Sequence, residues 1–289
     1  MFMEHSDMRR IPAGIIDFHV HLFPDRMSDA IWNYFNKEYR LNIHYKFYYR
    51  ECIQYLRARG VGKIVYSNYA HREGIAEGLN AWNNKVLAED PDLYCFAAYH
   101  PGDANALFYA EKILDHPRVL GVKLHLHVQR LYPHDRRLFP LYELATHRKK
   151  RILFHVGNGP LGNEFVGLDQ FQKLLNRYPD IQANIAHMGA FEYGGFMSLL
   201  DDHPGLYLDT AFAFFKEQQG HGGFNLGNAP LEKHQDRILY GSDFPNLILP
   251  RESEIETLLQ YNLSQEFYDK VFFYNGIKLI NALMNPEDK

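Results

Sequence analysis

The sequence has few cysteines, no long apolar run and no excess of basic residues. Each of these absences argues against one class of protein. Only Cys52 and Cys95 occur among 289 residues, too few for the disulfide framework of a small secreted domain. The N-terminal residues 1–10 are polar and lack the apolar stretch of a signal peptide. No uncharged apolar run approaches the ~20 residues that a membrane span needs. We therefore expect a soluble protein of the cytoplasm, with no membrane partner.

The charge balance gives no indication of a nucleic acid partner. The formal net charge is -4, and the basic residues do not gather into a stripe along the chain. The one dense basic run, residues 148–151, is interpreted as the end of a helix, where cations interact favourably with the helix dipole. Hydrophobic residues make up 46% of the chain, enough for a core, so we expect a folded protein whose partner is a small-molecule substrate.

Eight short apolar segments rich in β-forming residues alternate along the chain with stretches of helical periodicity. The predicted strands are 15–21, 63–69, 93–100, 119–128, 151–156, 181–187, 206–212 and 238–244. The predicted helices are 48–59, 73–89, 104–116, 138–149, 169–178 and 191–202. Strict alternation of this kind predicts a parallel sheet with crossover helices.

Eight successive βα units favour an α/β fold that closes as a (β/α)8 TIM barrel, with residues 1–289 forming a single domain. The main competitor is an open doubly wound sheet. Such a sheet normally has a glycine-rich phosphate loop after its first strand, where this sequence has His19-Val20-His21. Two longer loops, 22–45 and 213–228, are expected at the catalytic face. Their aromatic residues are interpreted as loop anchors, as an interface such as that of a homodimer, or as a wall for a ring.

Ionisable residues gather at the C-terminal ends of the predicted strands, where the active sites of barrel enzymes lie. Taken singly, each is most simply a hydrogen-bonded side chain, but burying all of them at one rim without a shared partner would carry a desolvation cost. Asp17, His19 and His21 are expected on one strand face, where the two imidazoles can converge on one ion. The full set comprises His19, His21, His100, Lys123, His125, His127, His155, His187, Asp209 and Asp243.

Four motifs in this set resemble the amidohydrolase superfamily. They are Asp17-x-His19-x-His21, His155-Val156-Gly157, His187-Met188-Gly189 and Gly241-Ser242-Asp243-Phe244-Pro245. The pattern is most similar to the amidohydrolase-2 branch, which contains aminocarboxymuconate-semialdehyde decarboxylase and related metal-dependent hydrolases. The segment 275–279 is similar to the Asn-Ala-x-x-Leu ending of that branch, with Gly276 in place of alanine.

The resemblance implies that His19, His21, His155 and Asp243 hold one divalent metal. Zinc is the first expectation; manganese, iron and cobalt remain open, and one ion is favoured over two. His187 would lie beside the metal-bound water, or would bind a second ion as in binuclear members.

The same resemblance leaves two possible roles for Lys123 and His125. They would either contact the substrate or take part in a second metal site. A lysine at the position of Lys123 is carbamylated and bridges two metals in some binuclear relatives, but it can equally pair with a substrate carboxylate.

The function that follows is hydrolysis of an amide, ester or lactone through a metal-activated water, with Asp243 and His187 as catalytic residues. Two alternatives stay open: a non-oxidative decarboxylase of an unsaturated or aromatic carboxylate, and a barrel that binds metal or ligand without turnover. A carboxylated substrate would find cations in Lys123 and in Arg72 and Arg130, although surface solvation explains the two arginines equally well.

Overall fold

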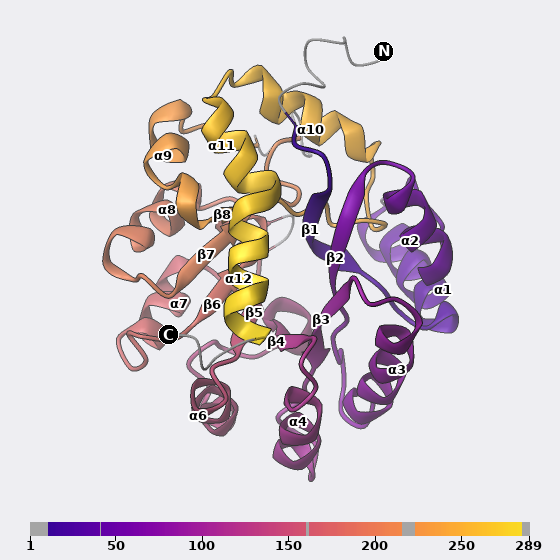
Figure 1. Cartoon of the computed structure of the whole chain (residues 1–289). Helices are drawn as coiled ribbons and strands as arrows, with labels where there is room; N and C mark the ends of the chain where they lie inside the picture. Colours follow the sequence, from indigo (N-terminus) through magenta and orange to yellow (C-terminus); the bar gives the residue numbers. More distant parts are fainter. Residues whose placement is uncertain (1–10, 41, 160–161, 216–222, 285–289) are drawn as a thin grey trace.

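The computed structural model describes residues 11–40, 42–159, 162–215 and 223–284, in which eight parallel strands form one sheet in the order of the sequence. The strands are β1 (Ile15–His21), β2 (Val61–Ser67), β3 (Leu93–Ala98), β4 (Val119–His125), β5 (Arg151–His155), β6 (Ala183–Ile185), β7 (Leu206–Asp209) and β8 (Ile238–Leu239). The sheet closes because the Phe18 amide donates to the Tyr240 carbonyl and the Asp243 amide to the His19 carbonyl, both at 2.8 Å. The predicted TIM barrel is therefore confirmed (Figure 1).

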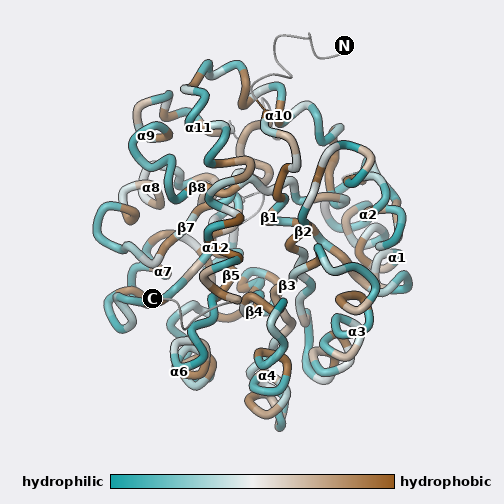
Figure 2. Tube along the Cα trace, in the orientation of Figure 1, coloured by the Kyte–Doolittle hydropathy of each residue, from teal (hydrophilic) through white to brown (hydrophobic). Residues whose placement is uncertain are grey.

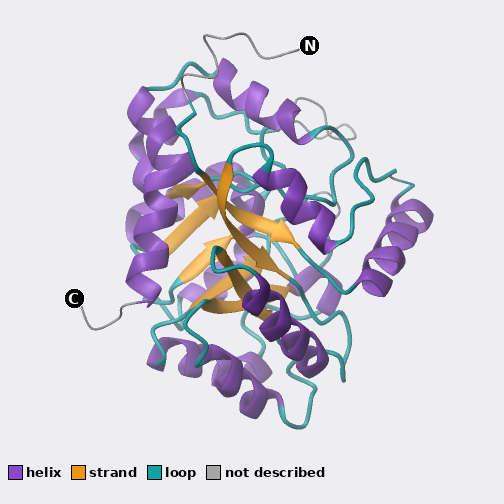
Figure 3. Ribbon diagram, turned by 45° about the vertical axis from the view of Figure 1, so that its right-hand side comes forward, coloured by secondary structure: helices purple, strands orange, loops and turns teal. Residues whose placement is uncertain are grey.

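Helices surround the strands on the outside of the barrel (Figure 3). They are α1 (Asp25–Tyr34), α2 (Tyr49–Arg57), α3 (Ala76–Glu89), α4 (Ala106–Leu114), α5 (Leu126–Gln129), α6 (Phe139–His147), α7 (Leu168–Leu175), α8 (Tyr193–Asp202), α9 (Asn228–Lys233), α10 (Arg251–Gln260), α11 (Gln265–Asp269) and α12 (Asn275–Met284). None of the helices in the described part of the chain is long and apolar enough to cross a membrane.

The core has two apolar layers. A large outer layer lies between strands and helices, and a smaller cluster fills the barrel itself. Figure 2 shows apolar residues recurring along the strands. Ile16 and Phe18 of β1 belong to the inner cluster, together with Leu279 and Ile280 of α12. Because these β1 residues precede the histidines, α12 covers the end of the barrel where the strands begin, and the opposite end remains for a functional site.

Several strands end earlier than predicted. They end just before the polar residues that lie at the barrel end away from α12. His127 lies on the short helix α5 and not on β4, and His187 lies in the 3-10 turn after β6 with φ 57°. Asp243 follows β8 in an irregular segment with φ 60°. An alternating pattern does not reveal where strand pairing stops, so the strands predicted from the sequence are too long at their C-terminal ends.

The structure describes the two segments predicted as long loops to different extents. Residues 22–45 contain α1 and a π-helical turn at Phe35–Tyr39, and the other residues of the segment that the structure describes are irregular. The segment 213–228 lies in part outside the described residues.

The expectation that Asp17 shares a face with His19 and His21 is wrong. A register irregularity between Asp17 and Val20 interrupts the alternation of β1. Asp17 Oδ1 instead accepts the backbone amides of His19 at 3.3 Å and Ser242 at 3.1 Å, and its Oδ2 lies 4.0 Å from Arg251 Nε. Asp17 thus ties β1 to the segment after β8 and stands outside the histidine cluster.

Candidate active site

His19, His21 and Asp243 converge where β1 meets the segment after β8. Asp243 Oδ1 lies 3.0 Å from His21 Nε2 and 3.4 Å from His19 Nε2, and the donor atoms of the three residues lie within 4.8 Å of one another. Gly241 permits this approach, because a Cβ at that position would lie 2.6 Å from the His19 Cβ. Two imidazoles and a carboxylate in this arrangement are a typical donor set for a divalent transition metal.

Asp209, at the end of β7, orients the imidazole of His19. Its Oδ2 accepts a hydrogen bond from His19 Nδ1 at 2.9 Å, and its Oδ1 accepts the backbone amides of His187 at 3.0 Å and Ala211 at 3.2 Å. The proton of His19 is therefore on Nδ1, and the lone pair on Nε2 points toward Asp243. His19 Nε2 is buried and has no hydrogen-bond partner, as expected of a nitrogen whose lone pair binds a metal ion.

Sequence reasoning noticed Asp209 at a strand end but gave it no role. Asp209 also groups with His19 and His187 as a second set of potential metal-binding atoms. Since both of its oxygens already accept hydrogen bonds, we interpret Asp209 as a support for His19 and not as a ligand.

Replacing Asp209 with asparagine should weaken metal binding about 10–100-fold, as loss of an outer-shell carboxylate typically does. The amide removes the negative charge and cannot present two acceptor oxygens to His19 and to the two backbone amides. Competition with a fluorescent chelator would measure the affinity, and the melting temperature would establish that the barrel is intact. Unchanged affinity in a folded variant would contradict the role assigned to Asp209.

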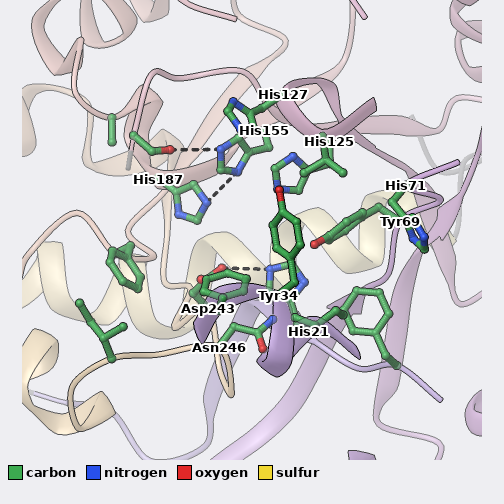
Figure 4. Close-up of a pocket in the computed structure, with 18 of the residues that line it drawn as sticks. His21, Tyr34, Tyr69, His71, His125, His127, His155, His187, Asp243 and Asn246 are labelled. Atoms are coloured by element: carbon green, nitrogen blue, oxygen red, sulfur yellow. Dashed lines mark hydrogen bonds and ion pairs between the residues drawn. The ribbon is translucent and has the colours of Figure 1, made fainter. Parts of the chain in front are cut away.

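His155 and His187 form a second pair beside the first group. His187 Nδ1 lies 2.9 Å from the Ala211 carbonyl, His155 Nε2 lies 3.2 Å from the Gly159 carbonyl, and His155 Nδ1 lies 3.2 Å from His187 Nε2 (Figure 4). Burial lowers the pKa of both imidazoles, which favours their neutral forms. If each neutral ring donates to its carbonyl, two lone pairs face each other. The lone pair on His155 Nδ1 is then available to a metal ion.

The structure therefore brings all the predicted ligands and His187 into one neighbourhood. The rings of His19 and His187 are 5.0 Å apart, and those of His155 and His187 are 4.8 Å apart. His155 is outside the tight group of His19, His21 and Asp243. His125 stacks on His155 with ring centroids 4.1 Å apart, whereas His100 does not line the pocket.

Lys123 is fully buried beneath this cluster and its Nζ has no hydrogen-bond partner. Burial lowers its pKa to about 8, although the charges of Asp209 and Asp243 oppose this change. An ammonium group without hydrogen bonds in such a site destabilises the folded state unless it loses its proton or gains a partner.

Replacing Lys123 with methionine should stabilise the metal-free protein by about 3 kcal/mol at pH 7. The reason is that the pKa of Lys123 is about 8 when folded and near 10.5 when unfolded. Between these values the unfolded chain binds more protons, so the unfolding free energy of the wild type should rise with pH. Denaturant unfolding of both proteins at several pH values would measure the difference, which should shrink as the pH rises from 8 to 10.5. A less stable variant, or a constant difference, would contradict the prediction.

A pocket of about 500 Å³ opens above the cluster. Its polar lining residues are His21, His71, His125, His127, His155, His187, Tyr69, Asp243 and Asn246. Its apolar lining residues include Phe23, Met27, Ile31, Phe35, Phe191, Phe212 and Ile248. Figure 4 shows the ring of Tyr34 pointing into this space from α1.

Sequence reasoning missed Tyr69, whose ring lies 4.6 Å from that of His125 and which has no distinguishing motif beyond its place just after β2. The segment that contains α1 was expected as a long loop at the catalytic face, and a wall for a ring was one of the roles left open for its aromatic residues. Tyr34 and Phe35 do line the pocket, but from a helix and the π-helical turn after it. Arg72 and Arg130, proposed as cations for a substrate carboxylate, are exposed and are not among the described lining residues.

Comparison with known proteins gives a family and a fold. A family model described as amidohydrolase matches residues 16–281. No curated protein is significantly similar to this sequence. An uncharacterised TIM-barrel protein from Bordetella bronchiseptica superimposes with a TM-score of 0.71 and 19% identity, covering 93% of this chain and 99% of the other.

Two structurally similar proteins are decarboxylases. A 5-carboxyvanillate decarboxylase from Sphingomonas paucimobilis has a TM-score of 0.63 and 13% identity, over 93% of this chain and 99% of its own. A dihydroxybenzoic acid decarboxylase from Polaromonas, solved with bound manganese, has a TM-score of 0.65 and 15% identity, over 94% and 98%. At these identities the similarity concerns the fold.

Proposed function

Because the chain belongs to the amidohydrolase family, we propose that it is a metal-dependent hydrolase that cleaves an amide, ester or lactone bond. The observation that carries the proposal is the convergence of His19, His21 and Asp243 around a buried imidazole nitrogen that lacks a partner. The pocket lies directly above these atoms, so a substrate carbonyl can reach them.

We assign a single divalent ion to His19, His21 and Asp243, whose donor atoms lie within 4.8 Å of one another, with His155 as the fourth ligand that the family resemblance implies. Zinc and manganese are the first candidates, zinc from the donor set and manganese by analogy with the Polaromonas decarboxylase. When bound, such an ion lowers the pKa of water from 15.7 toward ~7 and thereby supplies hydroxide at neutral pH.

Asp243 is the group that moves the proton. Burial alone would raise its pKa, but His21, hydrogen-bonded to Asp243 at 3.0 Å, outweighs burial and holds the pKa of this carboxyl well below its usual range. Asp243 is therefore a carboxylate at neutral pH and can accept a proton from water.

The bond changes of the reaction follow from this proton transfer. The water oxygen forms a bond to the acyl carbon, and the bond to the leaving oxygen or nitrogen breaks with its electron pair. The proton taken by Asp243 passes to that leaving atom. His187, whose Nδ1 is anchored on the Ala211 carbonyl, presents the lone pair of Nε2 beside the reacting group and can share the proton of the water.

Non-oxidative decarboxylation of an unsaturated or aromatic carboxylate is the second candidate. Structural similarity to two decarboxylases over nearly the whole chain favours it. The lining residues that the structure describes include no lysine or arginine, so in this reaction the substrate carboxylate would have to be held by the divalent ion.

One experiment separates these reactions and a third possibility, a barrel without turnover. The protein loaded with zinc or manganese is incubated with a panel of aryl esters, lactones, amides and aromatic carboxylates, and acid release and CO2 are followed separately. Acid release without CO2 supports the hydrolase, and CO2 without acid release overturns it. Elemental analysis on the same samples should give about one metal per chain. A ratio near two would instead make His187 and Lys123 ligands of a second ion.

A further inference from the structure

The ring of Phe244, the residue that follows Asp243, is fully buried among aromatic side chains from the other end of the chain. The Tyr55 ring stacks on it with centroids 4.8 Å apart and an interplanar angle of 13°, and the Tyr45 ring lies 4.8 Å from it at 51°. Phe47 lies 6.2 Å from it on a further side. We refer to Tyr45, Phe47 and Tyr55 as the Phe244 cage. Its members belong to α2 and to the segment just before α2.

The hydroxyl of Tyr45 links this cage to the start of α10. Tyr45 Oη accepts hydrogen bonds from the Tyr55 hydroxyl at 2.9 Å and from the Arg251 backbone amide at 3.1 Å, and it donates to Glu252 Oε2 at 3.4 Å. Glu252 Oε1 in turn accepts from Arg59 Nε at 3.0 Å, and the Arg59 guanidinium lies 3.5 Å from the centre of the Tyr55 ring. Because the hydroxyl donates once and accepts twice, the Tyr45 ring has little freedom to move.

The backbone around Phe244 connects the caged ring to the two donors that meet at the barrel seam. The Phe244 carbonyl accepts the His21 amide at 2.8 Å, and the Phe244 amide donates to Ser242 Oγ at 3.2 Å. Asp243 has a φ of 60°, a conformation that residues other than glycine adopt only where their surroundings hold it. A rotation at Asp243 that carried its carboxylate away from His21 would therefore also have to pull the Phe244 ring out of its cage.

A buried phenylalanine needs no functional explanation by itself, because aromatic residues are common in cores. Phe244 differs from an ordinary core residue in its place between the two members of one contact. It is bonded covalently to Asp243 and, through its carbonyl, by a hydrogen bond to the backbone of His21. The contact in question is the 3.0 Å distance between Asp243 Oδ1 and His21 Nε2.

We propose that Phe244, held by its cage, is a positioning residue that fixes the Asp243 carboxylate beside His21. It touches no reacting atom and acts only through Asp243. The inference rests on the proposed function, because it concerns the carboxylate assigned there as metal ligand and base. It adds that residues of α2, of the segment before it and of α10, which lie behind the site, help to keep that carboxylate in place.

Replacing Phe244 with leucine tests this role without a substrate. Leucine keeps an apolar side chain but cannot stack on Tyr55, so the variant should bind Co²⁺ about tenfold more weakly, at the lower end of the loss expected when a group that orients a ligand is removed. Competition with a fluorescent chelator would measure the affinity. The visible absorption spectrum of the cobalt-loaded protein, which depends on ligand geometry, should change as well.

Phe267→Leu is the matched control for this variant. Phe267 is an equally buried ring on α11, 5.6 Å from the ring of Tyr268, and it lies outside the Phe244 cage. Its replacement should lower the melting temperature to a similar degree but leave cobalt affinity and spectrum unchanged. Wild-type affinity and spectrum in a folded Phe244→Leu protein would overturn the proposal, because the ring would then be core packing alone.

Replacing Tyr45 with phenylalanine tests the cage by a milder change and decides the question if the first variant does not fold. All ring contacts with Phe244 are retained, and only the hydroxyl at the centre of the hydrogen bonds is lost. Cobalt affinity should fall about threefold, a fraction of the worth of one hydrogen bond. Tyr49→Phe is the control, since the Tyr49 hydroxyl bonds Glu89 at the surface of the protein. An affinity equal to that of the wild type in the Tyr45 variant would overturn the part assigned to the cage.

These measurements separate the inference from the proposed function. If the wild type cleaves no ester, lactone or amide, hydrolysis fails, while weaker cobalt binding by Phe244→Leu still supports the positioning role. If an ester is cleaved, the same variant with saturating metal should lose about 10- to 100-fold in kcat with little change in KM, since a small misplacement of a catalytic group is costly. Wild-type kcat together with wild-type affinity would overturn the positioning role while hydrolysis stands.

Discussion

Replacing His19 with alanine is expected to reduce the metal content of the purified protein from about one equivalent to less than about a tenth, and to abolish activity. His19 offers a buried nitrogen without a partner, already oriented by the 2.9 Å hydrogen bond to Asp209. Alanine removes one of the three tightly grouped donors and leaves Asp209 without its imidazole partner.

Elemental analysis of wild type and variant, purified in parallel, measures this effect directly. His147→Ala is the matched control, because His147 is exposed at the end of α6 and should affect neither metal content nor activity. Full metal occupancy in the His19 variant would show that the ion, if present, is bound elsewhere.

Replacing Asp243 with asparagine should lower kcat by about 10² to 10⁴, the usual contribution of a general acid–base group. Asparagine is nearly isosteric and is one of the few residues that tolerate the φ of 60° found here, so the backbone should be preserved. What the variant loses is the negative charge beside His19 and His21 and the ability to accept a proton.

Steady-state kinetics with saturating metal would separate the two consequences of this change. A loss of kcat that persists at high metal concentration reflects proton transfer, and a loss that added metal restores reflects coordination alone. Asp202→Asn, on the exposed end of α8, is the control for the charge change. Wild-type kcat in the Asp243 variant would exclude the carboxylate as the base.

The barrel was predictable because each strand is short, apolar and followed by a helical stretch, so the alternation is visible in one sequence. The family membership predicted from the four motifs is confirmed by the match over residues 16–281. Each of these motifs consists of residues close together in the sequence, so it can be recognised without knowledge of the three-dimensional structure.

The parts that escaped prediction depend on contacts between distant segments. Asp209 supports His19 from 190 positions away, and no spacing rule relates the two. The register irregularity in β1 separated Asp17 from the histidines, because strand pairing and not residue type determines where it occurs. The wall formed by α1 faces a cavity, and an amphipathic pattern does not distinguish a cavity from a core.

The predicted donors His21 and Asp243 meet across the seam between the first and last strands, 222 positions apart in the chain. During synthesis on the ribosome, the histidines of β1 emerge long before the aspartate exists, so a complete binding site cannot form on a partial barrel. An ion bound there would stabilise the closed barrel. It would cross-link the first and last strands and so lower the conformational entropy gained when these two strands separate. Uptake of metal by this protein would accordingly report that the ring of eight strands has closed.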